Sequence, residues 1–541
     1  MDFKKVINKI PDKYWYIFAL TLIFPALLIN LGLLTFNEDE AIRALVALEM
    51  KYSGNLIVPT LNGTYYYFKP PLYNWIILFF YNLLHDTSPW TARFVTIVNL
   101  LAFTFTVFLI NKKYLNAKQA ILIALIYITC GRIIFWDSML AYIDISYSWI
   151  TYMEIMSIYI FYKKKNYWAL FLISYLLMSV GFLMKGYTSL PFQGLSLIAF
   201  FIWKKDFKKL FSLPNFTGLA LFFLIIGIYY YAYNQYNDIM NTVGPLLDQS
   251  VRRTAIHQRI NILQTIKHIF TYPFENLYHF LPWSLMAIYL FSRKNVLKIF
   301  KNEFVAFNAL MFFVNIIVYW LSVEVYPRYI LMLMPMLFTV FVYLHESNKE
   351  ENSIYYRVLI FLFNIVFIAV FIFSFTPYWV KAAHLNGNFI LKTLLLNIFT
   401  LFLSIVFYFK RENKLIILIL LVLVVRIGYD WFVITGRYRE NPDAKYKRQT
   451  ISVANKYKTK DIFLYKKSKV DYTASYYIAR VRGKITTREF NEFLPQNYYY
   501  FDTSRYDLDT NVFKITDEFM VREFNRKIYV VNPKKRIIED N

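Results

Sequence analysis

The chain has 541 residues, of which 58% are apolar and 21% aromatic, and its formal net charge is +25. This apolar content is well above that of water-soluble domains and excludes a soluble globular protein. Apolar stretches of about 17 to 21 residues recur, which is the length that a helix needs to cross a bilayer. The lysines cluster between these stretches, and this pattern indicates membrane orientation rather than nucleic-acid binding. The single cysteine, Cys130, excludes an internal disulfide and a cysteine-based metal site.

The first predicted span covers Trp15 to Leu34. Four lysines precede it and no cleavage signal follows, so we expect an uncleaved helix with a cytoplasmic N-terminus. Later lysine clusters lie between the predicted spans. An even number of crossings separates each cluster from the next, so all of them fall on the same side as the N-terminus. Spans bounded in this way are Thr91 to Asn111, one starting near Asp144, Tyr187 to Trp203, and Leu415 to Val433. The expected fold class is an α-helical polytopic membrane protein with about 13 transmembrane helices and an outer C-terminus.

Residues 35–90 are expected to form a large first outer loop with interfacial helices. Its apolar segment Leu72 to Leu84 has about 13 residues, too few to cross a bilayer, and favours an interfacial or re-entrant helix. Gly54 predicts the end of a helix over Ala41 to Lys51, and Asn62-Gly63 predicts a tight turn.

After Val433 the apolar pattern gives way to mixed sequence. We therefore expect a transmembrane domain over residues 1–435 and a small α/β domain on the outer face over residues 436–541. Alternation and composition predict strands at Ile462 to Tyr465, Tyr498 to Phe501 and Ile528 to Val531, and helices at Tyr472 to Arg480 and Asp517 to Asn525.

Ionisable residues at the outer ends of spans are the main candidates for function, because charge at membrane depth is costly. Glu38, Asp39 and Glu40 follow the first span directly, and like charges so close oppose full ionisation unless a cation, a metal or a substrate compensates. The alternative is a solvated helix start, in which the carboxylates favour the positive end of the helix. Further charged residues at this level are Asp137, Asp144, Lys69, Lys185, Arg252, Arg253 and Arg328.

An acid for proton abstraction and cations for phosphate make the set of groups that a transferase needs. A transporter more often places charge in mid-span, where Arg426 and Asp430 are the candidates. These two lie one helical turn apart and are expected to pair with each other. For Lys69, snorkelling to lipid headgroups is the alternative to a role at the site.

Motifs along the membrane region carry a family resemblance. They are Asn37-Glu38-Asp39-Glu40, Leu61-Asn62-Gly63, Phe68-Lys69-Pro70-Pro71-Leu72, Phe182-Leu183-Met184-Lys185-Gly186, Phe280-Leu281-Pro282-Trp283 and Arg328-Tyr329. Together they resemble the bacterial membrane glycosyltransferases related to protein O-mannosyltransferases and to the aminoarabinose transferase of lipid A. The resemblance implies a GT-C enzyme of the bacterial plasma (inner) membrane. Such an enzyme transfers a sugar from a polyprenyl phosphate carrier to a lipid, glycan or protein acceptor on the outer face.

By this resemblance, Asp39 acts at the acceptor hydroxyl as a general base or through a bound metal, with Glu40 beside it and Asp144 as a second acidic residue. Lys69 and Lys185 match the lysines that are expected to meet the carrier's phosphate. We group Arg252, Arg253 and Arg328 with them as candidate phosphate-binding residues. A divalent metal held by Asp39 and Asp144 stays open, although Phe68 stands where some relatives have an acidic residue.

Two other functions compete with the transferase hypothesis. A lipid or sugar transporter (flippase) needs an inward-facing route, whereas the charge here gathers toward the outer face. In a non-catalytic envelope assembly protein, Asp39 would be replaceable.

Overall fold

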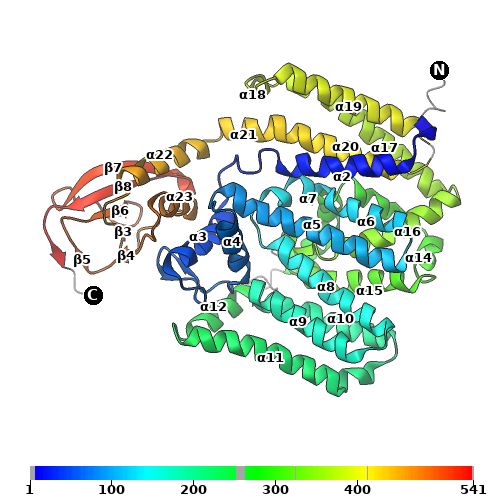
Figure 1. The fold of residues 1–541 in the computed structure, drawn as a ribbon, viewed down its shortest axis with the longest axis horizontal. Helices are drawn as coiled ribbons and strands as arrows, with labels where there is room; N and C mark the ends of the chain where they lie inside the picture. Colours follow the sequence, from blue (N-terminus) through cyan, green and yellow to red (C-terminus); the bar gives the residue numbers. More distant parts are fainter. Residues whose placement is uncertain (1–6, 252–261, 323–324, 411, 539–541) are drawn as a thin grey trace.

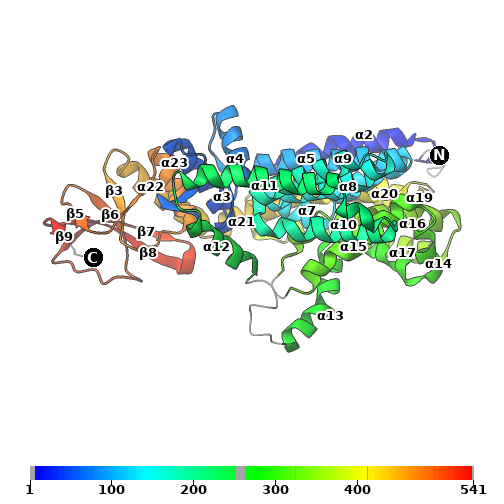
Figure 2. The ribbon, with the colours of Figure 1, turned by 90° about the horizontal axis from the view of Figure 1, so that it is seen from below.

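The computed structural model describes residues 7–251, 262–322, 325–410 and 412–538. The chain forms a long helical bundle with a small sheet domain at one end (Figure 1). Viewed from below, the helices run side by side along the long axis, and the sheet domain lies beyond their ends (Figure 2).

The bundle consists of long helices that follow the apolar stretches of the sequence and of shorter helices between them. In chain order they are α2 (Asp12–Leu28), α5 (Pro89–Tyr114), α6 (Ala117–Ile128), α7 (Gly131–Phe135), α8 (Asp144–Lys163), α9 (Tyr167–Lys185), α10 (Leu190–Trp203), α11 (Leu213–Asn234), α12 (Met240–Val251), α13 (Ile262–His279), α14 (Arg293–Ile299), α15 (Glu303–Trp320), α16 (Met334–Glu350), α17 (Ile354–Phe373), α18 (Lys381–His384), α19 (Phe389–Phe409), α20 (Lys414–Tyr429) and α21 (Thr435–Glu440). Short 3-10 turns η1 (Asp137–Met139), η2 (Gly186–Ser189), η4 (Trp283–Phe291) and η5 (Pro327–Ile330) connect some of them.

Seven of the described helical segments are long and apolar enough to cross a membrane, or eight if the bent pair over residues 117–139 is one span. This confirms a multi-pass membrane protein. One of the seven, Tyr167–Trp203, contains both α9 and α10. Gln193 donates a hydrogen bond to Ser174 at 2.8 Å, so the chain turns back after Lys185 and the two helices lie side by side. Other predicted spans are shorter, such as the 17-residue α2, and the count of about 13 stays a prediction.

The first loop, residues 35–90, folds as its local signals predict. Helix α3 (Glu38–Ser53) ends at Gly54, which has φ +73°. Strands β1 (Thr60–Leu61) and β2 (Thr64–Tyr65) form a hairpin whose turn residues, Asn62 and Gly63, have φ of 52° and 69°. The predicted short apolar helix is α4 (Leu72–Leu83).

Glu49 and Gly63 fix this hairpin in place. The buried Glu49 carboxylate accepts hydrogen bonds from the Thr60 hydroxyl at 2.7 Å and the Asn62 N–H at 2.6 Å. A Cβ at Gly63 would meet Thr487 of the sheet domain at 2.7 Å. Glycine is therefore needed at this position both for its φ and for the close approach.

The sheet domain is built on a five-stranded sheet in the order β4-β3-β6-β8-β7. Its elements are α22 (Asp443–Lys456), β3 (Ile462–Tyr465), α23 (Tyr472–Arg482), β4 (Arg488–Glu489), β6 (Tyr498–Asp502), β7 (Phe513–Val521) and β8 (Arg526–Pro533). Strands β4, β3 and β6 are parallel, whereas β8 is antiparallel to β6 and β7. A separate two-stranded pair joins β5 (Glu492–Phe493) to β9 (Ile537–Ile538).

The predicted strands at β3, β6 and β8 and the helix at α23 are confirmed. The predicted helix over Asp517 to Asn525 is wrong, because β7 runs to Val521 and only a 3-10 turn, η8 (Glu523–Asn525), follows. Phe519 and Val521 alternate into the core of the domain, and Phe519 pairs with Ile528 of β8. The pairing with β8 therefore overrides the acidic pair Asp517-Glu518, which looks like the first turn of a helix.

Helix α23 of the sheet domain packs against α3 of the first loop (Figure 1). The rings of Phe36 and Tyr476 meet edge to face at 4.8 Å, and the Thr473 hydroxyl donates to the Phe36 carbonyl at 3.3 Å. The Tyr476 hydroxyl donates to the Thr87 carbonyl. The sheet domain thus holds the residues just before Asp39.

Candidate active site

Four of the predicted site residues meet where the ends of three helices and the turn η5 come together. Asp39 is the second residue of α3, Asp144 the first of α8 and Lys185 the last of α9, and Arg328 lies in η5. Both carboxylates stand at helix N-termini and the lysine at a C-terminus, where the helix dipole favours each charge. The fold brings these residues together from four distant parts of the sequence.

Asp144 lies at the centre of this cluster. Its Oδ1 is 2.7 Å from the Lys185 Nζ, and its Oδ2 is 3.2 Å from the Arg328 Nε. Arg328 also reaches Asp39, with its Nη2 3.3 Å from the Asp39 Oδ2. The Asp144 side chain is 7% exposed and the Asp39 side chain 60%. Asp144 is thus a buried counter-ion, and Asp39 is the accessible carboxylate.

Aromatic rings surround the two cations. The Lys185 ammonium lies 4.4 Å from the centre of the Tyr329 ring and 4.8 Å from that of Tyr147. The Arg328 guanidinium lies 4.3 Å from the Tyr326 ring and 4.7 Å from the Tyr142 ring. Rings at these distances attract a cation and exclude water, which strengthens its interaction with an anion.

Tyr142 stands between the cations and the first loop. Burial raises the pKa of its hydroxyl above the ordinary value, and the negative charge of Glu40 adds to the effect. The hydroxyl therefore stays neutral at physiological pH, and the ring lies against the Arg328 guanidinium.

The other predicted phosphate-binding residues differ in position. Lys69 is half-buried in the first loop, and its charge acts on the Asp144 carboxylate. Arg252 and Arg253 lie outside the described residues. Asp137, the weaker sequence candidate, is held by Arg132 through Nε at 2.9 Å and Nη2 at 3.1 Å.

The Glu40 carboxylate is enclosed by hydrogen-bond donors, and its catalytic role stays a prediction. It is fully buried, and Arg93 holds both of its oxygens, at 2.8 Å through Nε and 3.0 Å through Nη2. The backbone N–H groups of Ala141 and Asn37 donate to the same carboxylate at 2.8 Å and 2.9 Å. These contacts tie α3 to α5 and to the segment before α8.

Arg93 is the residue of this network that the sequence hypotheses missed. It stands near the start of α5, and its guanidinium also donates to the carbonyls of Leu31, Leu34 and Thr35. The sequence did contain a signal for this role. Arg93 is a lone arginine at the end of an apolar span, and a charge in that position needs a partner.

We expect Arg93→Met to destabilise the protein by about 3 to 5 kcal/mol, since the buried Glu40 charge loses its partner. The double variant Glu40→Gln/Arg93→Met should recover part of that loss. The measurement is the thermal unfolding midpoint in detergent. An unchanged midpoint for Arg93→Met would show that the pair does not stabilise the first loop.

The residues present fit a divalent metal poorly. Asp144 already shares its oxygens with Lys185 and Arg328, and Asp39 shares Arg328 with it. Within the described ranges, no three His, Cys, Asp or Glu side chains gather closely enough to hold a metal ion. Two carboxylates whose charge is balanced by cations leave little net charge to attract a metal.

Arg426 and Asp430 pair with each other as expected. Their Nε and Oδ2 atoms are 2.9 Å apart, and both side chains are almost fully buried. The pair lies in α20 and just after it, and each residue provides the other's counter-charge.

Part of the membrane region matches a known protein family. Residues 68–231 match the family described as "Dolichyl-phosphate-mannose-protein mannosyltransferase". The predicted resemblance to these membrane glycosyltransferases is confirmed. The glycosyltransferase match covers α4 to α11, including Lys69, Asp144 and Lys185.

Two solved structures and one sequence relative extend the comparison. The fold is similar to ArnT from Cupriavidus metallidurans in the apo state, with a TM-score of 0.68 and 14% identity over 96% of this chain and 98% of that one. The same protein bound to undecaprenyl phosphate gives a TM-score of 0.67 and 14% identity, with 97% and 99% covered. An uncharacterized protein of Aquifex aeolicus (strain VF5) is 24% identical over 348 residues, which are 63% of this chain and 75% of that protein. At these identities the solved structures establish a shared fold.

Proposed function

We propose that the protein is an integral membrane glycosyltransferase that takes a sugar from a polyprenyl phosphate carrier. It transfers the sugar to a lipid, glycan or protein acceptor on the outer face of the bacterial plasma membrane, through a domain of about 13 spans. The observation that carries the proposal is an accessible carboxylate, Asp39, paired with Arg328, which Asp144 links to a second cation, Lys185; aromatic rings surround both cations. The fold relative ArnT, which has been solved with undecaprenyl phosphate, supports a polyprenyl phosphate donor.

The cations suit the donor phosphate. Lys185 and Arg328 both form ion pairs with Asp144, which holds the two cations close together. A donor phosphate takes up their remaining hydrogen-bonding capacity, and Lys69 adds positive charge nearby. Negative charge grows on the phosphate as the bond to the sugar breaks, so fixed cations stabilise the transition state more than the bound donor.

Asp39 suits the acceptor. Its carboxylate accepts the proton of the acceptor hydroxyl, and the oxygen then attacks the anomeric carbon of the donor sugar. The bond from that carbon to the phosphate oxygen breaks, and polyprenyl phosphate leaves with the electron pair. Asp144 acts as a positioning residue for the cations, and no step uses a metal.

An apolar cavity of about 230 Å³ suits the first part of the carrier's lipid tail. It lies between α13, η4, α15 and α16, and its lining includes Phe312, Trp320 and Met334. Ile330, which also lines it, is in the same turn as Arg328. A tail in this cavity therefore starts beside the phosphate-binding cations.

The test is transfer of radiolabelled sugar by the purified protein in vesicles that contain defined polyprenyl phosphate sugars. We expect label to move from donor to acceptor extract and polyprenyl phosphate to be released. Movement of label across the vesicle membrane without bond cleavage would overturn the transferase and favour the flippase.

We further expect the transfer rate to stay within about two-fold of its value when a chelator such as EDTA is added, because the carboxylates are compensated by cations. The measurement is the initial rate before and after chelation, with magnesium or manganese added back. A rate that falls with the chelator and returns with the metal would contradict this assignment.

A further inference from the structure

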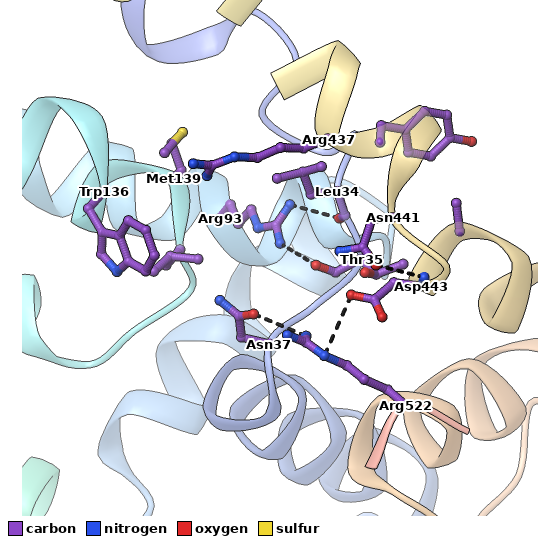
Figure 3. A pocket seen from close by; sticks show the side chains of 13 residues that line it. Leu34, Thr35, Asn37, Arg93, Trp136, Met139, Arg437, Asn441, Asp443 and Arg522 are labelled. Atoms are coloured by element: carbon purple, nitrogen blue, oxygen red, sulfur yellow. Dashed lines mark hydrogen bonds and ion pairs between the residues drawn. The ribbon is translucent and has the colours of Figure 1, made fainter. Parts of the chain in front are cut away.

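A cavity of about 160 Å³ with both charged and apolar residues in its lining lies between the helical bundle and the sheet domain (Figure 3). We call it the seam pocket, and its charged lining residues are Arg93, Arg437, Asp443 and Arg522. Asn37, two residues before Asp39, forms part of its wall. The seam pocket is separate from the cations that we assign to the donor.

The arginines of the seam pocket differ in how their charge is compensated. Arg93 pairs with Glu40, and Arg522 lies 3.5 Å from Asp443 and donates to the Asn37 side chain at 3.1 Å. Arg437 belongs to α21 and is exposed, and its side chain extends across the pocket toward Met139 (Figure 3). In the part of the chain that the structure describes, its recorded contact is the ring of Tyr429 at 5.7 Å, and it makes no ion pair. One guanidinium in the pocket is therefore uncompensated.

Charged residues continue beyond the pocket. A smaller neighbouring cavity shares Thr35, Asp443 and Arg522 with the seam pocket and is also lined by Lys447 and Asp471. Burial lowers the pKa of Lys447, and the positive charges of Arg480 and Arg93 lower it further. Cations that repel one another across an interdomain seam favour the binding of an anion.

We propose that the seam pocket binds a phosphate or carboxylate substituent of the acceptor, and so directs the acceptor hydroxyl toward Asp39. This inference rests on the proposed function. The guanidinium fork of Arg437 matches either anion, which it can hold through two parallel hydrogen bonds. The volume is smaller than that of pockets that enclose a whole ligand, about 300 to 1,000 Å³, and fits one charged substituent.

The test uses the purified full chain with its donor site saturated by polyprenyl phosphate. Radiolabelled glucose 6-phosphate, glucuronate and uncharged glucose are then compared by equilibrium dialysis. We expect saturable binding of a charged sugar, weakened about ten-fold by Arg437→Gln and unchanged by the matched control Arg439→Gln in the same helix. The better of the two charged sugars identifies phosphate or carboxylate as the preferred group.

Three results would overturn the proposal for the seam pocket. Glucose could bind as tightly as the charged sugars, Arg437→Gln could bind them as tightly as Arg439→Gln, or neither charged sugar could bind saturably. Binding of polyprenyl phosphate is measured separately, with Lys185→Gln as its own control. If polyprenyl phosphate binds and the charged sugars do not, the donor site stands and the seam pocket is refuted. If the charged sugars bind and polyprenyl phosphate does not, the proposed function fails instead.

Discussion

Replacing Asp39 with Asn is expected to lower the transfer rate about 10³-fold and to leave the fold intact. A general base contributes about 10² to 10⁴ to the rate, and an amide of the same shape cannot accept the proton of the acceptor hydroxyl. The side chain is 60% exposed, and its ion pair with Arg328 is 3.3 Å long. Loss of such a pair changes stability by less than about 1 kcal/mol. Initial rates at saturating donor and the thermal unfolding midpoint measure the two effects.

The matched control for this variant is Asp507→Asn, which removes an exposed carboxylate from the sheet domain. It should transfer sugar at the wild-type rate. If Asp39→Asn also kept the wild-type rate, the carboxylate would not be the base, and the envelope assembly hypothesis would gain support.

Replacing Lys185 with Met is expected to lower kcat/KM for the donor about 10² to 10³-fold, because a cation that stabilises the growing phosphate charge is lost. The same change should cost about 3 kcal/mol of stability, since buried Asp144 loses its shortest ion pair and keeps the one with Arg328. Donor-dependent kinetics and thermal unfolding of the purified protein give both quantities.

A second substitution separates these effects. In Lys185→Met/Asp144→Asn the unpaired carboxylate is removed, so stability should recover while transfer stays low. Asp144→Asn alone keeps Lys185 and should bind polyprenyl phosphate at least as tightly as the wild type, since the carboxylate no longer competes for the ammonium. Recovery of transfer together with stability in the double variant would mean that Lys185 has only a structural role.

The features that the sequence alone predicted correctly depend on short-range chemistry. Helix α3 ends at Gly54 and the hairpin turns at Asn62 and Gly63 because each of these residues suits a positive φ, whatever surrounds it. The short helix α4 and the long apolar helices follow from the length of their apolar runs. Asp144 and Lys185 were proposed as site residues because charge at the end of a span is costly, and the structure pairs them with each other.

The features that the sequence left open depend on partners far away in the chain. Asp39 and Glu40 are adjacent in the sequence. Arg93 and the Ala141 N–H bind the buried Glu40 carboxylate, whereas the Asp39 carboxylate stays accessible beside Arg328. In the same way, the extended conformation of β7 depends on its pairing with β8.

The sequence by itself thus determined the class of protein, the start of its first loop and the inventory of charges. Only the tertiary structure decided which carboxylate is accessible, which cations converge on Asp144 and where the seam pocket forms. The physical reason is that apolar length and turn chemistry act within a few residues. The accessibility and compensation of a charge, by contrast, are set by whichever distant segments the fold brings against it.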